Sequence, residues 1–494
     1  MVKAKRTKVP VIDTGNSLSS PLLEINFREP LFTTAAHPTE PILISGLGTG
    51  DIFAYRYDLD KLRDCHEKRK FENLQRSLKN SEDSNRGASR KDWSTVDDHA
   101  DAKVEGIVTL WKTRRHKGSC RSVTFDPLES SLGAYVFSVG KDHIIKKAQT
   151  ETGKVVSKAS AFQSYSDERD AITYLTHSST HPFLLSGTEN GDVLVFDSNR
   201  LSSDNLRFDV RGAHDDAVNC ILPMPTVSAY HYLCLGSTTL SHIDIRKGLV
   251  AQSDNQEDEL LSMCYSNECI DSHNNDCVLV GHGEGILSIW KKSKNNFTDQ
   301  LSRVKVNKNA SIEVVMPTMS DDDDNNDCVW CGDSDGLLHR VNFKNGKTVE
   351  TRIHSVANGK LGVTDEVTML DLDYRYSLIS AGMDSLKIWS GSEGNEPQQT
   401  DDEVDNTSDN SITYESNDED PIPYPEYSQK PTPKEPVQDS FEKSDKVSQI
   451  LPEVHTLEEG VPFKKKKVSK SETRNHVPKK KKAFEHGIHK FEDL

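Results

Sequence analysis

The stretch VLVGHGEGILSIW, residues 278–290, contains the pattern that decides the fold. Gly281, Gly283 and Gly285 stand between two runs of apolar residues. A dinucleotide-binding loop spaces its glycines more widely and continues into a helix whose N-terminus holds the phosphates. Here the residues after Gly285 are ILSIW, whose branched and aromatic side chains favour a strand. The stretch therefore predicts a β-hairpin with a tight glycine turn.

The same pattern of strand, glycine, short turn and second strand occurs seven times. The seven stretches begin at Ile42, Tyr135, Phe183, Tyr232, Val278, Cys328 and Ser377. From the second stretch onward a glycine recurs every 45 to 51 residues, and the first interval is longer. A repeat of this length with about four short strands is typical of a WD40-type propeller blade. We therefore predict an all-β fold, a seven-bladed WD40-type β-propeller.

Individual residues support this prediction. Trp290 and Trp389 stand near the end of the second strand of their units, where WD repeats carry a tryptophan. Lys147 stands near that place in the second unit. His116 and His214 precede the first strand of their units. The repeats therefore match WD repeats in side-chain chemistry as well as in length.

The histidine, serine and aspartate of each unit could be mistaken for a hydrolase triad. WD repeats use these residue types as structure, hydrogen-bonded toward the tryptophan. Ser380, Asp384 and Trp389 match three of these four places, and no stretch resembles a nucleophile elbow. We predict that the protein is not an enzyme and has no catalytic residues, no cofactor and no small-molecule substrate.

The cysteines and the hydropathy of the chain indicate the kind of cellular compartment to expect for the protein. Nine cysteines lie scattered in strand-like runs, which fits buried thiols in a reducing compartment. Cys328 and Cys331 form a lone C-x-x-C within an expected strand, whereas zinc needs four ligands, so no metal site is predicted. No apolar run approaches the roughly 20 residues of a membrane helix, and no hydrophobic segment follows the basic start of the chain. We expect a soluble intracellular protein without a membrane partner.

Closure of the ring predicts where the propeller begins and ends. The segment PLLEINF, residues 21–27, precedes the first full unit and is expected to pair with residues 387–390 as the outer strand of the seventh blade, because an open seam exposes sheet edges. The propeller should then span residues 22–391. Residues 58–105 interrupt it with a polar, charged stretch that lacks strand periodicity, which predicts a long disordered insertion.

The remaining segments are predicted to be disordered. The chain of 494 residues has a net charge of −17, with 34% hydrophobic and 28% charged residues, a mix that indicates a substantial disordered fraction. Residues 1–21 form a basic N-terminus. Residues 392–460 form an acidic linker, since residues 391–460 carry 19 Asp and Glu against 4 Lys and Arg. Residues 461–494 form a lysine-rich tail, with 11 Lys and Arg against 4 Asp and Glu.

Two lysine clusters stand out in this tail. They consist of Lys464, Lys465, Lys466, Lys467, Lys479, Lys480, Lys481 and Lys482. Short lysine runs of this kind bind nuclear import receptors, and they also attach to phosphate backbones without reading sequence. The alternative is a solvated tail that carries no targeting signal. We expect the protein in the nucleus and the nucleolus, with import receptors as partners and a non-specific RNA contact through the tail.

A dense positive group precedes the second unit. Its members are Arg114, Arg115, His116, Lys117 and Arg121. One hypothesis is a contact with an acidic partner or with RNA phosphate. The alternative is a solvated loop whose histidine fixes the turn. The sequence leaves both open.

A resemblance to a known protein family narrows the range of functions that the sequence suggests. The stretch WKTRRHKGSCRSVTFDP, residues 111–127, followed by YVFSVGKDHIIKKAQTETGKVV, resembles the WD repeat-containing protein 55 family, including its fungal nucleolar members. AAHPTEPILISGLGTGDIFAYRY and GAHDDAVNCI add to the likeness, which covers the propeller and extends to the tail. The resemblance implies a non-enzymatic nucleolar scaffold in ribosome biogenesis, acting in maturation of the large subunit or its RNA. Its partners would be proteins of pre-ribosomal particles.

A second hypothesis is a substrate receptor of a cullin-4 ubiquitin ligase. In HIDIRKG, residues 242–248, Asp244 and Arg246 resemble the WD-x-R box that the ligase adaptor binds, with Ile243 in place of the tryptophan. A D-x-R sequence after a blade strand often serves only to stabilise the blade corner. Motif matches without structural context leave both interpretations open.

Overall fold

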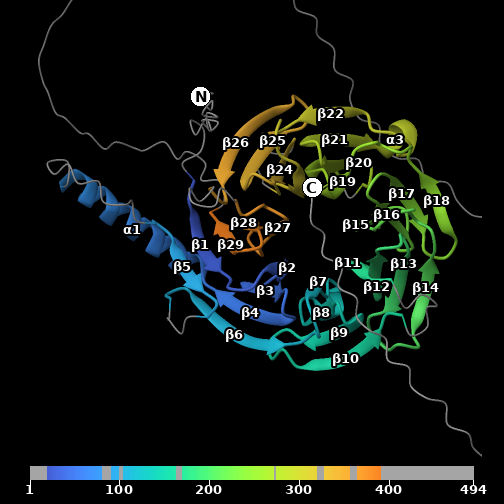
Figure 1. Ribbon diagram of the computed structural model, residues 1–494, viewed down its shortest axis with the longest axis horizontal. Coiled ribbons are helices and arrows are strands. Elements are labelled where there is room, and N and C mark those ends of the chain that lie inside the picture. The colour runs from blue at the N-terminus through green and yellow to red at the C-terminus, as the bar shows by residue number, and fades with distance from the viewer. Residues whose placement is uncertain are drawn as a thin grey trace, which may run out of the picture. The chain divides into compact units, whose positions relative to one another are not determined.

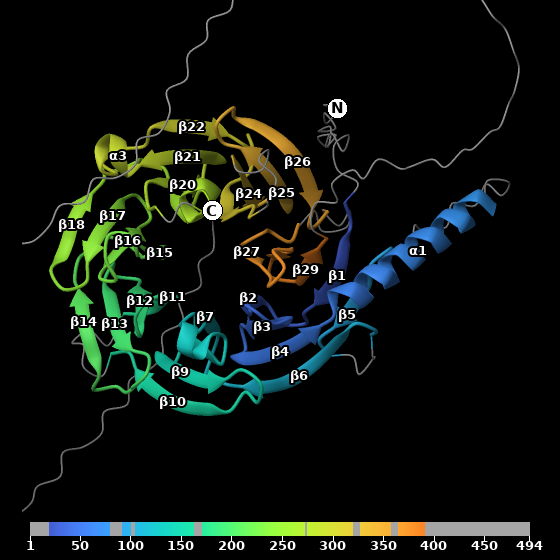
Figure 2. The ribbon, with the colours of Figure 1, turned by 180° about the vertical axis from the view of Figure 1, so that it is seen from behind.

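The computed structural model has seven β-sheets around a common axis (Figures 1 and 2). The structure describes residues 19–79, 91–99, 104–162, 170–271, 274–319, 327–356 and 364–390. Within each blade, neighbouring strands of the meander are antiparallel and the first strand lies nearest the axis. This arrangement confirms the predicted seven-bladed propeller.

Blades 1 to 4 contain four strands each. Blade 1 consists of β2 (Leu31–Ala36), β3 (Ile42–Leu47), β4 (Asp51–Tyr57) and β6 (Ile107–Arg114). Blade 2 consists of β7 (Cys120–Phe125), β8 (Tyr135–Gly140), β9 (Ile144–Gln149) and β10 (Val155–Ser160). Blade 3 consists of β11 (Ile172–His177), β12 (Phe183–Thr188), β13 (Val193–Asp197) and β14 (Leu206–Val210). Blade 4 consists of β15 (Cys220–Pro223), β16 (His231–Leu235), β17 (Leu240–Asp244) and β18 (Gly248–Gln252).

Blades 5 to 7 complete the ring. Blade 5 consists of β19 (Leu260–Tyr265), β20 (Cys277–His282), β21 (Ile286–Lys291) and β22 (Ser302–Lys305). Blade 6 consists of β23 (Ile312–Pro317), β24 (Cys328–Asp333), β25 (Leu337–Asn342) and β26 (Lys347–Ile353). Blade 7 consists of β27 (Met369–Leu372), β28 (Leu378–Ala381), β29 (Ser385–Trp389), β1 (Pro21–Asn26) and β5 (Ser94–Asp97). The described helices are α1 (Leu59–Lys79), α2 (Asn267–Asp271), α3 (Lys292–Asn295) and the 3-10 helix η3 (Glu129–Ser131).

Residues 278–290 form the hairpin predicted from their glycines, made by β20 and β21. Gly285 has a φ of +75°, which favours glycine. A Cβ at Gly285 would lie 2.3 Å from the carbonyl oxygens of Asn307 and Ala310, on the segment that leads into the next blade. This glycine therefore serves a tight turn and a close contact between blades, and does not form a phosphate-binding loop.

The N-terminal strand closes the ring, as predicted. β1 pairs antiparallel with β29, with Ile25 opposite Leu386 and Glu24 opposite Lys387. Leu23 and Ile25 are fully buried in the core that the two strands share. One detail of the prediction is wrong: β1 is not the outermost strand of the blade, because β5 adds to it in parallel orientation.

The prediction for residues 58–105 is also wrong where the structure describes them. This insertion contains the 21-residue helix α1 and the strand β5, and is not simply a long loop. The Asp58 side chain caps the helix by accepting a hydrogen bond of 3.2 Å from the backbone N–H of Lys61. Leu59 and Leu62 are buried against β1 and its neighbours. A helix needs few apolar residues at spacings of three and four, so the missing strand periodicity did not imply disorder.

The predicted disordered ends lie outside the described residues. These are residues 1–18 of the N-terminus, the acidic linker 392–460 and the lysine-rich tail 461–494. The predictions made for them therefore stay predictions.

Candidate functional site

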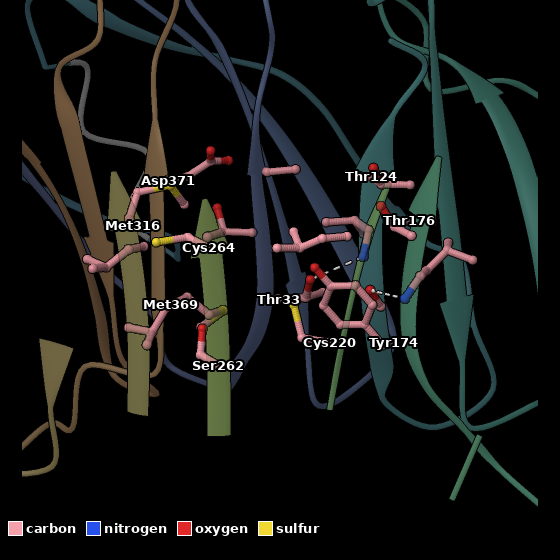
Figure 3. A pocket seen from close by; sticks show the side chains of 18 of the residues that line it. Thr33, Thr124, Tyr174, Thr176, Cys220, Ser262, Cys264, Met316, Met369 and Asp371 are labelled. Atoms are coloured by element: carbon pink, nitrogen blue, oxygen red, sulfur yellow. Dashed lines mark hydrogen bonds between the residues drawn. The ribbon is translucent and has the colours of Figure 1, made fainter. Parts of the chain in front are cut away.

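A channel along the axis of the ring is lined by the first strand of every blade. Its cavity has a volume of about 690 Å³. Figure 3 shows side chains of this wall, and one labelled residue from each blade is Thr33, Thr124, Tyr174, Cys220, Ser262, Met316 and Met369. These seven side chains present hydroxyl groups, sulfur atoms and apolar groups, and Arg121, Glu313 and Asp371 add charged groups to the wall.

The hydroxyl groups of the wall join neighbouring blades. Thr33 Oγ1 accepts a hydrogen bond of 3.1 Å from the backbone N–H of Val123, in the next blade. Ser122 Oγ accepts one of 3.2 Å from the N–H of Leu175, one blade further on. Figure 3 draws hydrogen bonds of this kind as dashed lines. These polar groups are thus used to hold the ring together.

Asp371 makes the corresponding contact at the point where the ring closes. Its carboxylate accepts a hydrogen bond of 2.7 Å from the backbone N–H of Ala36, which joins blade 7 to blade 1. Burial raises the pKa of Asp371 to about 6, although the backbone N–H groups of Ala36 and Leu372 counteract it. Among these contacts between blades, the one made by Asp371 therefore depends on a carboxylate whose pKa is raised to about 6.

The serine and the tryptophan predicted as structural lie together in blade 7, and His354, a histidine that the sequence analysis did not name, joins them. Trp389 Nε1 donates a hydrogen bond of 2.8 Å to Ser380 Oγ, which lies 2.8 Å from His354 Nδ1. All three side chains are buried. A neutral imidazole satisfies this chain of hydrogen bonds, and burial lowers the pKa of His354 accordingly. The Ser380 hydroxyl group is buried and is hydrogen-bonded inside the blade, so it faces no open site.

The aspartate of this network is not the predicted one. Asp365 Oδ2 lies 3.4 Å from His354 Nε2 and accepts a hydrogen bond of 2.9 Å from the Ser385 backbone N–H. Asp384, the predicted member, instead donates its own backbone N–H to Asp365 at 3.0 Å. Asp365 precedes the blade in the chain, so the turn position alone did not identify it.

Blade 2 has a different set of residues at the corresponding places. His116 Nδ1 lies 2.9 Å from Asp142 and its Nε2 lies 2.9 Å from Ser138 Oγ. Lys147, at the tryptophan place, is buried and donates a hydrogen bond of 3.0 Å to the Ser198 carbonyl oxygen. Its ammonium group also lies 4.1 Å from the centre of the Tyr135 ring. The unit lacks the tryptophan but keeps the hydrogen-bonded histidine.

The structure divides the positive group predicted to bind a partner. Arg114 and Lys117 are exposed. Arg121 is partly exposed and its guanidinium lies 3.2 Å from a carboxylate oxygen of Glu189. His116 is buried in the blade 2 network, so its role is structural.

Arg115 is the second residue of the positive group that is buried and therefore not on the surface. It is 6% exposed, stacks 5.0 Å from the Trp111 ring and donates a hydrogen bond of 2.7 Å to the Gly153 carbonyl oxygen. Trp111 Nε1 donates one of 2.8 Å to the Thr150 carbonyl oxygen. Burial lowers the pKa of Arg115 to about 10. The pair ties the outer strand of blade 1 to the last turn of blade 2, because Gly153 and Thr150 lie in that turn.

Asp244 and Arg246 form a blade corner. Arg246 contacts the buried Asp244 carboxylate through two hydrogen bonds, of 2.9 Å from Nε and 2.8 Å from Nη2. The guanidinium also lies 4.2 Å from the centre of the Tyr230 ring. This geometry favours the structural interpretation of the D-x-R sequence, since both partners are within blade 4.

Three further predictions concern metal, membrane and tail. Cys328 and Cys331 lie in β24 and are both buried. Within the described ranges, no group of three or more His, Cys, Asp and Glu residues is placed to hold a metal ion. None of the helices that the structure describes is long and apolar enough to cross a membrane. The two lysine clusters, residues 464–467 and 479–482, lie outside the described residues.

A surface on α1 escaped the sequence analysis. Phe71, Leu74 and Leu78 are exposed on this helix. Their spacing of three and four residues, after an aspartate at the helix start, is the signal that could have revealed an amphipathic helix.

Comparison with known proteins places the chain in a family. No family model matches it. It is 58% identical over 410 residues to WD repeat-containing protein JIP5 of Debaryomyces hansenii, an alignment that covers 79% of this chain and 69% of the relative. The chain belongs to the fungal JIP5 family of WD-repeat proteins. JIP5 of Scheffersomyces stipitis is 56% identical over 406 residues, covering 80% of this chain and 76% of the relative.

A JIP5 relative with lower sequence identity aligns over a similar share of the chain. JIP5 of Saccharomyces cerevisiae is 38% identical over 426 residues, covering 79% of this chain and 80% of the relative. The printed names of these JIP5 proteins state WD repeats. A WD-repeat propeller of this kind indicates a scaffold role, because a rigid ring presents loops on its surface for docking.

Proposed function

We propose that the protein is a non-enzymatic scaffold of ribosome biogenesis in the nucleolus, acting in maturation of the large subunit or its RNA. The observation that carries the scaffold role is the closed ring whose His, Ser and Asp groups are bound to one another. His354 and Ser380, for example, are committed to Trp389 and Asp365 inside blade 7. The ribosomal role is supported by the resemblance of residues 111–127 to the WD repeat-containing protein 55 family.

The partners proposed are proteins of pre-ribosomal particles and import receptors. The lysine-rich tail supports both import and a non-specific contact with RNA, because its cations neutralise phosphates. The propeller is a poor general binder of RNA, since residues 1–390, which include it, carry 46 Lys and Arg against 55 Asp and Glu.

Gradient sedimentation tests this function. The tagged full chain is expected to sediment with precursors of the large subunit, and its depletion is expected to raise the level of large-subunit precursor RNA. The small-subunit precursors serve as the internal control. Sedimentation only as free protein, with unchanged precursor RNA after depletion, would refute the ribosomal role.

The cullin-4 ligase hypothesis has one observation in its favour. The Arg246 side chain is 42% exposed although Asp244 holds it in place, so part of this side chain is accessible to a partner. Pull-down with the wild type and with Arg246→Ala separates the two functions. Adaptor subunits that are captured by the wild type and lost in the variant would favour the ligase.

A further inference from the structure

Helix α1 extends outward from the ring next to β1 and β5 (Figures 1 and 2). Its first turn is fixed to the propeller by Leu59 and Leu62, which are buried. Asp60 accepts hydrogen bonds of 2.8 and 3.2 Å from the guanidinium of Arg375, in blade 7. The base of the helix is therefore anchored, and the rest is held at a defined position on the rim.

The middle of α1 faces the propeller with polar side chains. Arg69 Nη1 donates a hydrogen bond of 2.8 Å to Ser94 Oγ, in β5. Asn73 Nδ2 donates one to the Asp92 carboxylate, just before that strand. These contacts define the inner face of the helix as polar.

The outer face of α1 is apolar. Phe71, Leu74 and Leu78 are 61%, 59% and 70% exposed. With 3.6 residues per turn, their spacing places them on one face, on the side away from Arg69 and Asn73. The usual polarity of a surface helix is thus reversed, because its apolar stripe points to solvent.

Cations flank this stripe. Lys68 and Lys70 are both exposed and lie on either side of it on the helix, and the exposed Glu67 lies on the face of the stripe one turn before Phe71. The helix as a whole, Leu59–Lys79, carries seven Lys and Arg against four Asp and Glu, in a chain with a net charge of −17. Around Phe71 and Leu74 the exposed cations Lys68 and Lys70 outnumber the exposed carboxylate of Glu67, so this surface is apolar with a cationic margin.

We propose that α1 is a docking helix for a partner protein that offers an apolar groove edged by carboxylates. Anchors at positions i, i+3 and i+7 are the pattern of a helix bound in a groove. The charge around Phe71 and Leu74 selects an acidic partner. Nucleic acid is the weaker match, because its phosphates would leave the apolar stripe in water. This inference does not rest on the ribosomal role.

A cross-linking amino acid at position 74 identifies the occupant. The full chain with p-benzoylphenylalanine in place of Leu74 is expressed in Saccharomyces cerevisiae and irradiated, and a chain with the same group at Val250, on the outer strand of blade 4, is the control. A discrete protein cross-linked from position 74 and absent from the control is expected. Cross-links only to RNA, only to a second copy of the chain, or to nothing would each overturn the proposal.

Binding of the cross-linked protein, once purified, then tests the mechanism. Phe71→Ser with Leu74→Ser is expected to weaken its affinity for the full chain by about tenfold or more. Lys68→Glu with Lys70→Glu should weaken it as well, and added salt should reduce the difference. The matched control is Leu249→Ser with Val250→Ser, which removes two apolar groups that are 46% and 49% exposed.

Affinity that survives the change of Phe71 and Leu74 would also overturn the proposal. All variants alter exposed side chains, so their thermal unfolding should match the wild type. The stripe variant is also run on the sedimentation gradients used above. Particle association by the wild type tests the ribosomal role by itself, whatever the outcome for α1.

Discussion

The indole Nε1 of Trp93 donates a hydrogen bond of 2.6 Å to a carboxylate oxygen of Glu24. Trp93 belongs to the insertion and Glu24 to β1, so the insertion contacts the strand that closes the ring. Burial raises the pKa of Glu24, but hydrogen bonds from Lys91 and Trp93 and the charge of Lys387 outweigh it and lower the pKa overall. The carboxylate is therefore ionised, and it joins β29, β1 and the insertion.

Removal of β1 should destabilise the whole propeller. Deletion of residues 1–30 exposes β29 and removes the buried Leu23 and Ile25. The melting temperature is expected to fall by at least about 10 °C, since each lost apolar side chain costs about 2–5 kcal/mol. Deletion of residues 1–18 alone is the control and should leave thermal unfolding unchanged. Equal melting of both truncated chains would contradict the closure.

Arg114 and Arg115 should respond oppositely to mutation. Arg115→Ala removes the contacts with Trp111 and Gly153 and is expected to lower the free energy of unfolding by about 2–4 kcal/mol. Arg114→Ala changes an exposed side chain and should stay within about 0.5 kcal/mol of the wild type. Urea unfolding of the two variants measures the difference. A stable Arg115→Ala variant would mean that the contact with blade 2 is dispensable.

Buried histidines should make the fold sensitive to acid. Burial lowers the pKa of His214 to about 4, below the value of about 6.5 in an unfolded chain. The unfolded chain then binds more protons, so stability falls as the pH drops through 6.5 toward 4. His214 alone should account for about 2 kcal/mol between pH 7 and pH 5.

Other groups add to this dependence or oppose it. The pKa is lowered by burial in the same direction at His116, His177, His282 and His354. Asp371 has the opposite sign, because its pKa is raised to about 6 and its protonation below that pH favours the folded chain. Urea unfolding at pH 7, 6 and 5 should show a net loss of stability that is smaller in His214→Gln. An identical pH dependence in this variant would rule out His214 as a contributor.

The lysine clusters should direct the protein to the nucleus. Changing Lys464 to Lys467 and Lys479 to Lys482 to alanine is expected to move the protein to the cytoplasm. Either cluster alone should have a smaller effect, because two weak sites on one chain raise each other's effective concentration. Fluorescence microscopy measures the distribution, and thermal unfolding should stay unchanged because no described blade contains these lysines. Nucleolar accumulation of the eightfold variant would mean that the targeting signal lies outside these two lysine clusters.

The fold could be predicted from the sequence because its signal is local. Each hairpin, such as residues 278–290, carries its own apolar strands and its own turn glycine, and the repeat supplies the number of blades. The pairing of β1 with β29 followed from the same logic, since an unpaired sheet edge is unfavourable. The helix α1 was missed because its few apolar residues are diluted by charged ones.

The site residues could be predicted only in part. Ser380 and Trp389 were assigned correctly, because both belong to the strands of the repeat. Asp365 was not, since it reaches His354 from the segment before the blade. Arg114 and Arg115 are adjacent and chemically identical in the sequence, yet one is exposed and the other is buried.

The sequence by itself determined the repeat, the number of blades and the strand that closes the ring, because strand propensity, turn chemistry and period are properties of neighbouring residues. Only the tertiary structure decided which polar groups are buried and hydrogen-bonded inside the ring and which side chains remain on its surface. Arg115 is buried because the turn at Gly153, in the next blade, packs against it. Phe71 is exposed because Arg69 and Asn73 turn the opposite face of α1 toward the propeller. Such outcomes depend on contacts between segments far apart in the chain, and the local pattern of residues does not contain them.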